Sequence, residues 1–129
     1  MSDRITRLSL RLDFGDTVRL GPGKVRLLET IGERGSISAA GRAMGMSYRR
    51  AWLLVDSLNQ AFAEPVVATR PGGKADRRAE LTPFGREVIR RFRAMEAAAG
   101  KAIARDLRIL EGAIKRDAAP PRMQDPEPR

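Results

Sequence analysis

Two helical patterns of apolar and small residues lie between Ser36 and Phe62, with very little chain between them. The first pattern has the i, i+3, i+4, i+7 spacing of one buried helix face, at Ile37, Ala40, Gly41 and Met44. The second pattern also has helical spacing, at Ala51, Leu54, Val55, Leu58 and Phe62. Gly45 can end the first helix in the left-handed conformation, and Ser47 can cap the second at once. These features predict two closely crossing helices joined by a tight turn, the helix-turn-helix arrangement.

A third helical pattern precedes these two and completes a three-helix unit. Gly21-Pro22-Gly23 breaks the chain, with proline at a tolerated first-turn position of the helix. The core stripe of this helix is predicted at Val25, Leu28 and Ile31, helped by Leu27. Gly32 and Gly35 are expected to end the helix just before Ser36. We assign this helix a structural role.

The amino-terminal part of the chain, from Ile5 to Leu20, alternates between apolar and polar residues. That alternation is the period of a strand with one buried face, and its apolar positions are Leu8, Leu10, Leu12 and Phe14. Gly15-Asp16 suits a turn, and a short return strand follows with Val18 and Leu20. An isolated hairpin is only marginally stable, so this one should pack on helices or pair with another strand.

A second hairpin with a basic tip is predicted after Glu64-Pro65 stops the helix. Residues 65–70 and 79–81 have strand patterns, and the loop 71–78 between them carries the cations Lys74, Arg77 and Arg78. Helices followed by such a hairpin are the order of a winged helix, whose wing reaches phosphates or the minor groove. The alternative is an exposed hairpin whose charges only protect its edge strands. We favour contact with DNA, because the loop is both turn-rich and cationic.

A long helix is predicted from Pro83, with Thr82 as its cap. Its apolar residues form one seam, at Val88, Phe92, Met95, Ala99, Ile103, Leu107, Leu110 and Ile114. A seam of this length needs a partner, so dimerisation is favoured over folding back onto the same domain. The extra four-residue step at Ala99-Gly100 leaves open whether the seam stutters or one helix becomes two.

Together these patterns predict a mainly α protein with small β-hairpins. Its architecture would be a winged helix-turn-helix with an N-terminal β-hairpin and a long C-terminal dimerisation helix. Residues 1–82 would form the DNA-binding domain, residues 83–116 the dimerisation helix, and residues 117–129 a disordered tail, because that last segment is proline-rich and polar.

Composition and charge narrow the possible partners. The 129 residues carry a net charge of +9, from 25 Lys and Arg against 16 Asp and Glu, which suits a polyanion. The absence of His and Cys excludes imidazole, thiol and zinc-finger chemistry. The acids are scattered and no nucleophile adjoins a base, so we expect no enzyme, no metal and no cofactor. The amino terminus is neither a signal peptide nor a membrane span, so we expect a cytoplasmic protein without a membrane partner.

The entrance of the second helix of the pair carries the candidate base-reading residues. The first turn of this helix points into the major groove in a helix-turn-helix. Arg49 is the best candidate, because a guanidinium can bind guanine O6 and N7 as a bidentate donor, worth about 1–3 kcal/mol of discrimination. Arg50 would either read a base or bind phosphate. Tyr48 and Trp52 are four residues apart and can stack together or touch bases and sugars; alternatively, Trp52 is wedged under the first helix.

Other candidate residues would contact the DNA backbone. Ser36 and Ser47 lie at helix amino termini, where hydroxyl and backbone donors can meet phosphates. Capping is an equally good role for both serines and does not exclude phosphate contact. Lys74, Arg77 and Arg78 are assigned to phosphates beside the wing.

The blocks that carry these residues resemble a known family. The run GSISAAGRAMGMSYRRAWLLVDSLNQAF, followed by EPVVATRPGGKADRRAELTPFGREVI, is similar to the amino-terminal winged helix-turn-helix of the ModE family of bacterial molybdate-dependent transcription regulators. The blocks match in order and spacing and cover roughly Leu8 to Met95. More distantly, the region resembles the DNA-binding domain of LysR-type regulators.

The resemblance implies a sequence-specific transcription regulator that binds double-stranded DNA at a two-fold operator as a homodimer. Family members that sense molybdate carry a carboxy-terminal pair of small oxyanion-binding domains, and this chain ends before such domains could fit. We therefore do not expect molybdate binding in cis. The alternative function is a basic winged-helix module that binds RNA or a protein partner without operator specificity.

Overall fold

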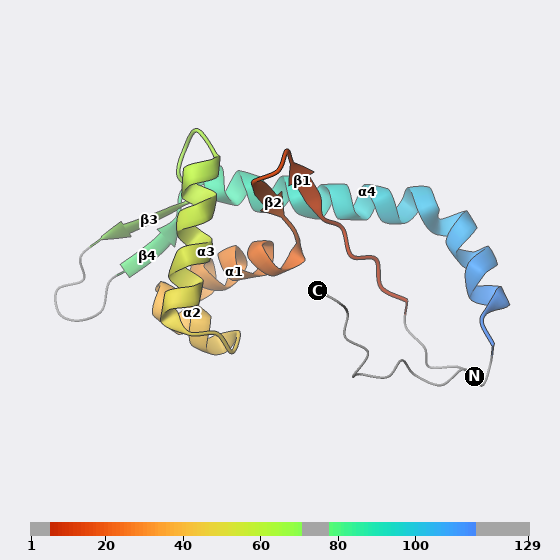
Figure 1. The fold of residues 1–129 in the computed structure, drawn as a ribbon, viewed down its shortest axis with the longest axis horizontal. Helices are drawn as coiled ribbons and strands as arrows, with labels where there is room; N and C mark the ends of the chain where they lie inside the picture. Colours follow the sequence, from red (N-terminus) through yellow and green to blue (C-terminus); the bar gives the residue numbers. More distant parts are fainter. Residues whose placement is uncertain (1–5, 71–77, 116–129) are drawn as a thin grey trace.

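The computed structural model describes residues 6–70 and 78–115, and this part of the chain contains four helices and two antiparallel hairpins (Figure 1). Their bounds are β1 Leu12–Phe14, β2 Val18–Leu20, α1 Pro22–Arg34, α2 Ile37–Ala43, α3 Tyr48–Ala61, β3 Val67–Arg70, β4 Arg78–Leu81 and α4 Pro83–Ala113. The expected class, mainly helical with small hairpins in the order of a winged helix-turn-helix, is confirmed.

Helix α1 forms the centre of the core. It contacts α2, α3, α4 and β4, and its fully buried side chains are Val25, Leu27, Leu28 and Ile31. Gly35 ends α1 with a left-handed φ of 80°, as predicted. The prediction that Gly32 also ends the helix is wrong, because Gly32 lies inside α1. A Cβ on Gly32 would lie 2.8 Å from Cδ1 of Leu81, so its missing side chain makes room for β4.

Helices α2 and α3 cross closely through small residues. A Cβ on Gly41 would lie 3.2 Å from both the Cβ of Ala51 and the carbonyl oxygen of Met46. Gly45 takes a φ of 72° in the turn between the two helices. The predicted helix-turn-helix is therefore present. Fewer of the residues predicted for the buried face of α3 are fully covered than expected. Ala51, Val55 and Leu58 are buried, whereas Leu54 and Phe62 are only partly buried.

The β3–β4 hairpin is attached to the turn between α1 and α2. The two strands pair from Val67 with Leu81 to Arg70 with Arg78, and the amide of Ala79 donates to the carbonyl oxygen of Gly35 over 2.9 Å. Arg78 was predicted as the last residue of the loop, but it begins β4 because it pairs across the hairpin. The rest of the predicted loop, including Lys74 and Arg77, lies outside the described residues.

The amino-terminal hairpin is shorter than predicted. Strands β1 and β2 pair over three residues each, from Leu12 with Leu20 to Phe14 with Val18, around Gly15 at a φ of 70°. Residues 6–11 keep the alternating pattern but form no strand. Within the described part of the chain this segment has no neighbouring strand to pair with, and a strand needs such a partner for its backbone hydrogen bonds.

Helix α4 is continuous through Gly100, so the extra four-residue step at Ala99-Gly100 lies within one helix and does not divide it into two. Among the described residues, the buried apolar side chains of α4 come from its first part, at Val88 and Phe92. Beyond this part the helix extends away from the other elements (Figure 1). Its exposed apolar residues are Met95, Ile109 and Leu110, and Ile114, directly after its end, is exposed as well. The described residues therefore give no support to the alternative that the seam folds back onto its own domain. None of the helices described is long and apolar enough to cross a membrane.

An ion-pair network fixes the direction in which α4 leaves the domain. The guanidinium of Arg93 donates to both carboxylate oxygens of Glu29 on α1, over 2.8 and 3.0 Å, and to Glu96 over 2.7 Å. The hydrogen bond from Arg93 lowers the pKa of the Glu29 carboxyl, against a smaller opposing effect of burial. The pair joins two helices that are far apart in sequence, and its bidentate geometry restrains their mutual rotation.

The close approach of α4 to the chain at Val66 generates a stability prediction. A Cβ on Gly85, in the first turn of α4, would lie 2.1 Å from the carbonyl oxygen of Val66, a backbone atom that has little room to move. Gly85→Ala should therefore lower the free energy of unfolding in urea by about 2 kcal/mol or more. Gly112→Ala is the matched control, because a Cβ there meets nothing within 4 Å, and this variant should be at least as stable as the wild type. Wild-type stability of Gly85→Ala would contradict the close approach.

Candidate nucleic-acid interface

Helix α3 presents one continuous face away from the core. Its buried residues Ala51, Val55 and Leu58 pack against the domain. Residues on the opposite side recur at helical spacing and are exposed or half-exposed: Arg49, Leu53, Asp56 and Gln60. This outward face therefore combines a guanidinium, an aliphatic side chain, a carboxylate and an amide, which are the groups that can distinguish base edges.

The amino terminus of α3 is electropositive. Its first turn contains no acidic residue and carries Arg49 and Arg50, both exposed, next to the positive end of the helix dipole. The Ser47 hydroxyl accepts a hydrogen bond from the amide of Arg50 over 3.1 Å. The capping role predicted for Ser47 is thus confirmed, and its exposed hydroxyl keeps a proton to donate.

Ser36 has the same role at the start of α2. Its hydroxyl oxygen accepts from the amide of Ala39 over 2.9 Å, so this predicted cap is also confirmed. On the exposed face of α2, the guanidinium of Arg42 donates to the hydroxyl of Ser38 over 3.1 Å. The sequence pattern did not single out Arg42, although the first helix of such a motif is the one that crosses the DNA backbone. Phosphate contact by Ser36 or Ser47 stays a prediction.

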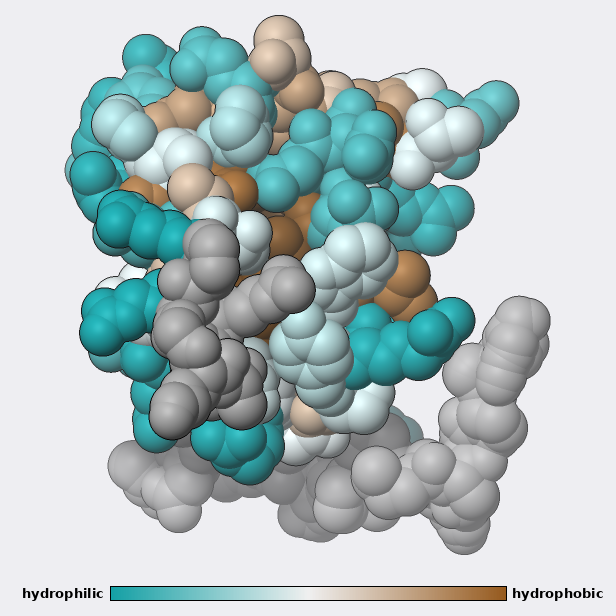
Figure 2. All heavy atoms as spheres, turned by 90° about the vertical axis from the view of Figure 1, so that its left-hand side faces the viewer, coloured by the Kyte–Doolittle hydropathy of each residue, from teal (hydrophilic) through white to brown (hydrophobic). Residues whose placement is uncertain are grey.

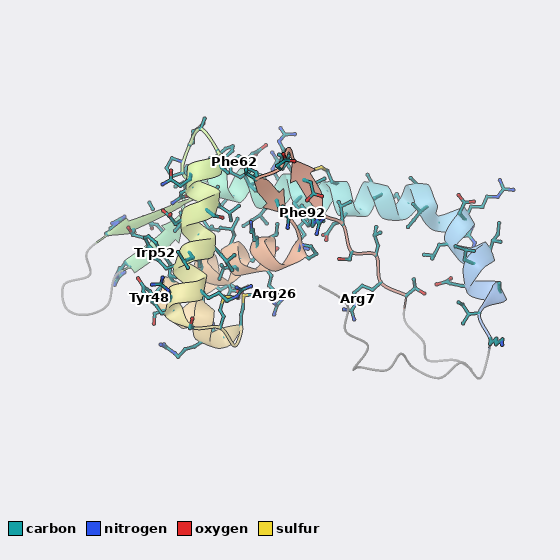
Figure 3. All side chains as sticks on the ribbon, in the orientation of Figure 1. Arg7, Arg26, Tyr48, Trp52, Phe62 and Phe92 are labelled. Carbon is teal, nitrogen blue, oxygen red and sulfur yellow. The ribbon has the colours of Figure 1, made fainter. Side chains whose placement is uncertain are left out.

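Tyr48 and Trp52 lie on the side of α3 that faces the β3–β4 hairpin (Figure 3). Asn59 is seven residues after Trp52, two turns along the same side of the helix, and contacts β3. Trp52 is 41% exposed, so it is not part of the buried core. Its contact with bases or sugars and the alternative, that it is wedged under the first helix, both stay predictions. In the part of the chain described, Phe62 and Phe84 form an edge-to-face aromatic pair, whereas Tyr48 and Trp52 form no such ring pair.

Asn59 joins the outward-facing helix to the hairpin. Its side-chain oxygen accepts from the amides of Val66 and Val67, over 2.7 and 3.2 Å, and its side-chain nitrogen donates to the carbonyl oxygen of Val67 over 3.1 Å. Three backbone groups of the hairpin entry are therefore satisfied by one side chain of α3. Sequence reasoning missed this residue, because an Asn on the flank of an amphipathic helix gives no local signal of a partner eight residues away.

The loop end of the two hairpin strands carries two cations directly opposite each other. Arg70 and Arg78 are cross-strand partners in β3 and β4, and both are exposed. Arg70 also pairs with Glu80 over 2.6 Å, with both side chains 59% exposed, so the ion pair leaves much of the guanidinium accessible. From the sequence, Arg70 was predicted only as part of a strand. That it lies directly opposite Arg78 follows from the register of the two strands.

The end of the molecule that carries the hairpin has a mixed surface. Seen from this end, hydrophilic residues predominate and apolar residues are exposed between them (Figure 2). The exposed groups of α3, including its first turn, and the loop end of the hairpin strands together make a cationic surface with apolar side chains inside it. Such a surface suits a polyanion whose interior edges are partly apolar, as duplex DNA is.

Comparison with known proteins identifies relatives for most of the chain. It is 48% identical to the molybdenum-pterin-binding protein MopB of Rhodobacter capsulatus over 83 residues, 64% of this chain and 31% of MopB. It is 35% identical to MopA of the same organism over 114 residues, 88% of this chain and 42% of MopA. It is 34% identical to the DNA-binding transcriptional dual regulator ModE of Escherichia coli K12 over 71 residues, 55% of this chain and 27% of ModE.

The chain thus spans about a third of the length of these relatives. No protein-family model matches it. The names of the relatives describe regulators and molybdenum-pterin-binding proteins rather than enzymes.

The Asn59 contacts generate a stability prediction. Asn59→Ala leaves two amides and a carbonyl group of the hairpin entry without their partner, so the free energy of unfolding should fall by about 2 kcal/mol. Gln60→Ala, at the next and exposed position of α3, is the matched control and should change it by less than about 0.5 kcal/mol. Chemical denaturation of both variants gives the comparison. Equal losses in the two variants would mean that Asn59 does not hold the hairpin.

Proposed function

We propose that this chain, which is a homologue of the ModE and Mop proteins, is a sequence-specific DNA-binding transcription regulator. The observation that supports the proposal most strongly is the exposed Arg49 in the first turn of α3, on a helix whose outward face is exposed or half-exposed. DNA binding by the ModE relative supports the same function. The matched region covers only part of each relative, so the function is proposed for this chain on its own residues.

In the proposed complex, α3 lies in the major groove and the hairpin follows the backbone beside it. Arg49 reads a base edge, and Arg50 binds either a base or the adjoining phosphate. Ser36 and Ser47 donate to phosphates at the starts of α2 and α3. Phosphate contacts fix the register of the protein on the duplex, and base contacts supply the sequence preference.

The wing of the proposed complex supplies cations to the backbone. Arg78 and its partner Arg70 lie at the loop end of the hairpin strands, and Lys74 and Arg77 belong to the same proposed set. Each cation that neutralises a phosphate releases a condensed counterion. The wing therefore contributes affinity for any duplex, whereas α3 contributes the discrimination between sequences.

We further propose that the protein acts as a homodimer through α4. Near its carboxyl end this helix presents the seam residue Leu110, and the seam residue Ile114 follows directly after its last turn; they are 64% and 50% exposed. A second copy of the same helix would cover this apolar seam in a two-fold arrangement, with residues 83–116 as the dimerisation segment. Two recognition helices related by a two-fold axis would then match a two-fold operator.

Arginine substitutions separate base reading from backbone contact. On a duplex obtained by in vitro selection, Arg49→Ala should lower affinity about 10- to 100-fold and should leave affinity for random duplex DNA nearly unchanged. Arg78→Ala should weaken binding to both duplexes and reduce the slope of log affinity against log salt by about one. Arg108→Ala, an exposed arginine far along α4, is the control and should change neither.

Fluorescence anisotropy at several salt concentrations measures these affinities. The base-reading role is refuted if Arg49→Ala weakens the selected and the random duplex by the same factor. Tighter binding of the wild type to RNA than to any duplex would favour the alternative function, a basic module without operator specificity.

Substitutions in α4 test the homodimer. The wild type should sediment as a dimer at micromolar concentration, and Leu110→Asp should yield monomers, because a carboxylate would be buried in the apolar seam. Arg108→Asp adds the same carboxylate on the other side of the helix and should leave the dimer intact. A monomeric wild type, or dimers with Leu110→Asp, would rule out this interface.

A further inference from the structure

We infer that Leu53 reads thymine through its 5-methyl group, so that each half-site contains a thymine contacted by this side chain. The inference rests on the proposed DNA-binding function and names a base that the outward face of α3 selects. The starting observation is that this apolar side chain is exposed, so packing within the domain does not account for its presence.

Leu53 is 47% exposed in the middle of the outward face of α3. Arg49 precedes it by one helical turn and Asp56 follows on the same face. A single exposed leucine is ordinary, but here Trp52 and Tyr48 are also exposed within the same two turns, at 41% and 50%. The apolar area is thus concentrated on the part of α3 that would enter the groove.

The major groove offers one apolar group to such a side chain. Thymine carries a 5-methyl group there, whereas cytosine presents an amino donor and guanine two acceptors. Covering either of these polar edges with leucine would remove water from a group that then lacks a hydrogen-bond partner. Leu53 therefore favours thymine for two reasons. It contacts the methyl group of thymine, and it would remove water from the polar edges of the competing bases.

The spacing on α3 sets where the thymine should lie. Leu53 is four residues beyond Arg49, a rise of about 6 Å along the helix axis. Stacked bases on one strand are about 3.4 Å apart. A thymine read by Leu53 should therefore lie about two base pairs from the base read by Arg49. Trp52, on the side of α3 toward the hairpin, would shield this contact from water.

Removal of single methyl groups from the DNA tests the contact. Deoxyuridine in place of each thymine of the selected duplex removes only the 5-methyl group and keeps base pairing. At one thymine in each half-site, this replacement should lower wild-type affinity about fourfold, the value of one buried methyl group. With Leu53→Ala, affinity for the thymine duplex should fall, and the replacement at that position should have no further effect.

Ile109→Ala is the matched control, because Ile109 is also an exposed aliphatic residue, at 62% against 47% for Leu53, and lies on the far half of α4 outside the apolar seam. This variant should keep the full deoxyuridine effect. Specific binding in which no thymine couples to Leu53 would overturn this inference and leave the proposed function standing. A wild type that selects no duplex at all would instead overturn the proposed function together with the inference.

Discussion

The burial of one face of α1 is the interaction on which the other elements depend. Helices α2, α3 and α4 and strand β4 all contact α1, whose side chains Val25, Leu27, Leu28 and Ile31 are fully buried. Burial of each such side chain is worth about 1.5–3 kcal/mol. Because the outward face of α3 and the paired strands of the hairpin are both positioned by elements that pack on α1, the geometry of the candidate interface is set in the core rather than on the surface.

Close backbone approaches then fix the angles between these elements. Gly41 lets α2 cross α3, Gly32 admits Leu81 of β4, and Gly85 brings α4 against Val66. The Asn59 side chain and the hydrogen bond from Ala79 to Gly35 add polar contacts that hold the hairpin beside α3. Glycine and small-residue contacts are short and leave little freedom, so the domain can present α3 and the hairpin in a constant relation to a duplex.

The sequence alone predicts what depends on local pattern. Helical spacing located all four helices, and the caps Ser36, Ser47 and Thr82 are where local chemistry places them. Contacts between distant residues were not predictable from the local pattern. Strand β1 does not include residues 6–11, because no described strand pairs with them, and Gly32 makes room for Leu81 instead of ending a helix. The same holds for Asn59. The exposed positions of Arg49, Tyr48 and Trp52 agree with the proposed interface, and their contacts with DNA stay predictions.

The central claim is that this surface distinguishes one DNA sequence from others. The most direct measurement is competition, in which the wild-type protein bound to a selected duplex is challenged with a scrambled duplex of the same length and composition at about 150 mM salt. We predict that the scrambled duplex competes at least about 1,000-fold less effectively than the selected one. Equal competition by the two duplexes would contradict the account, because it would leave only the charge of the surface to explain binding.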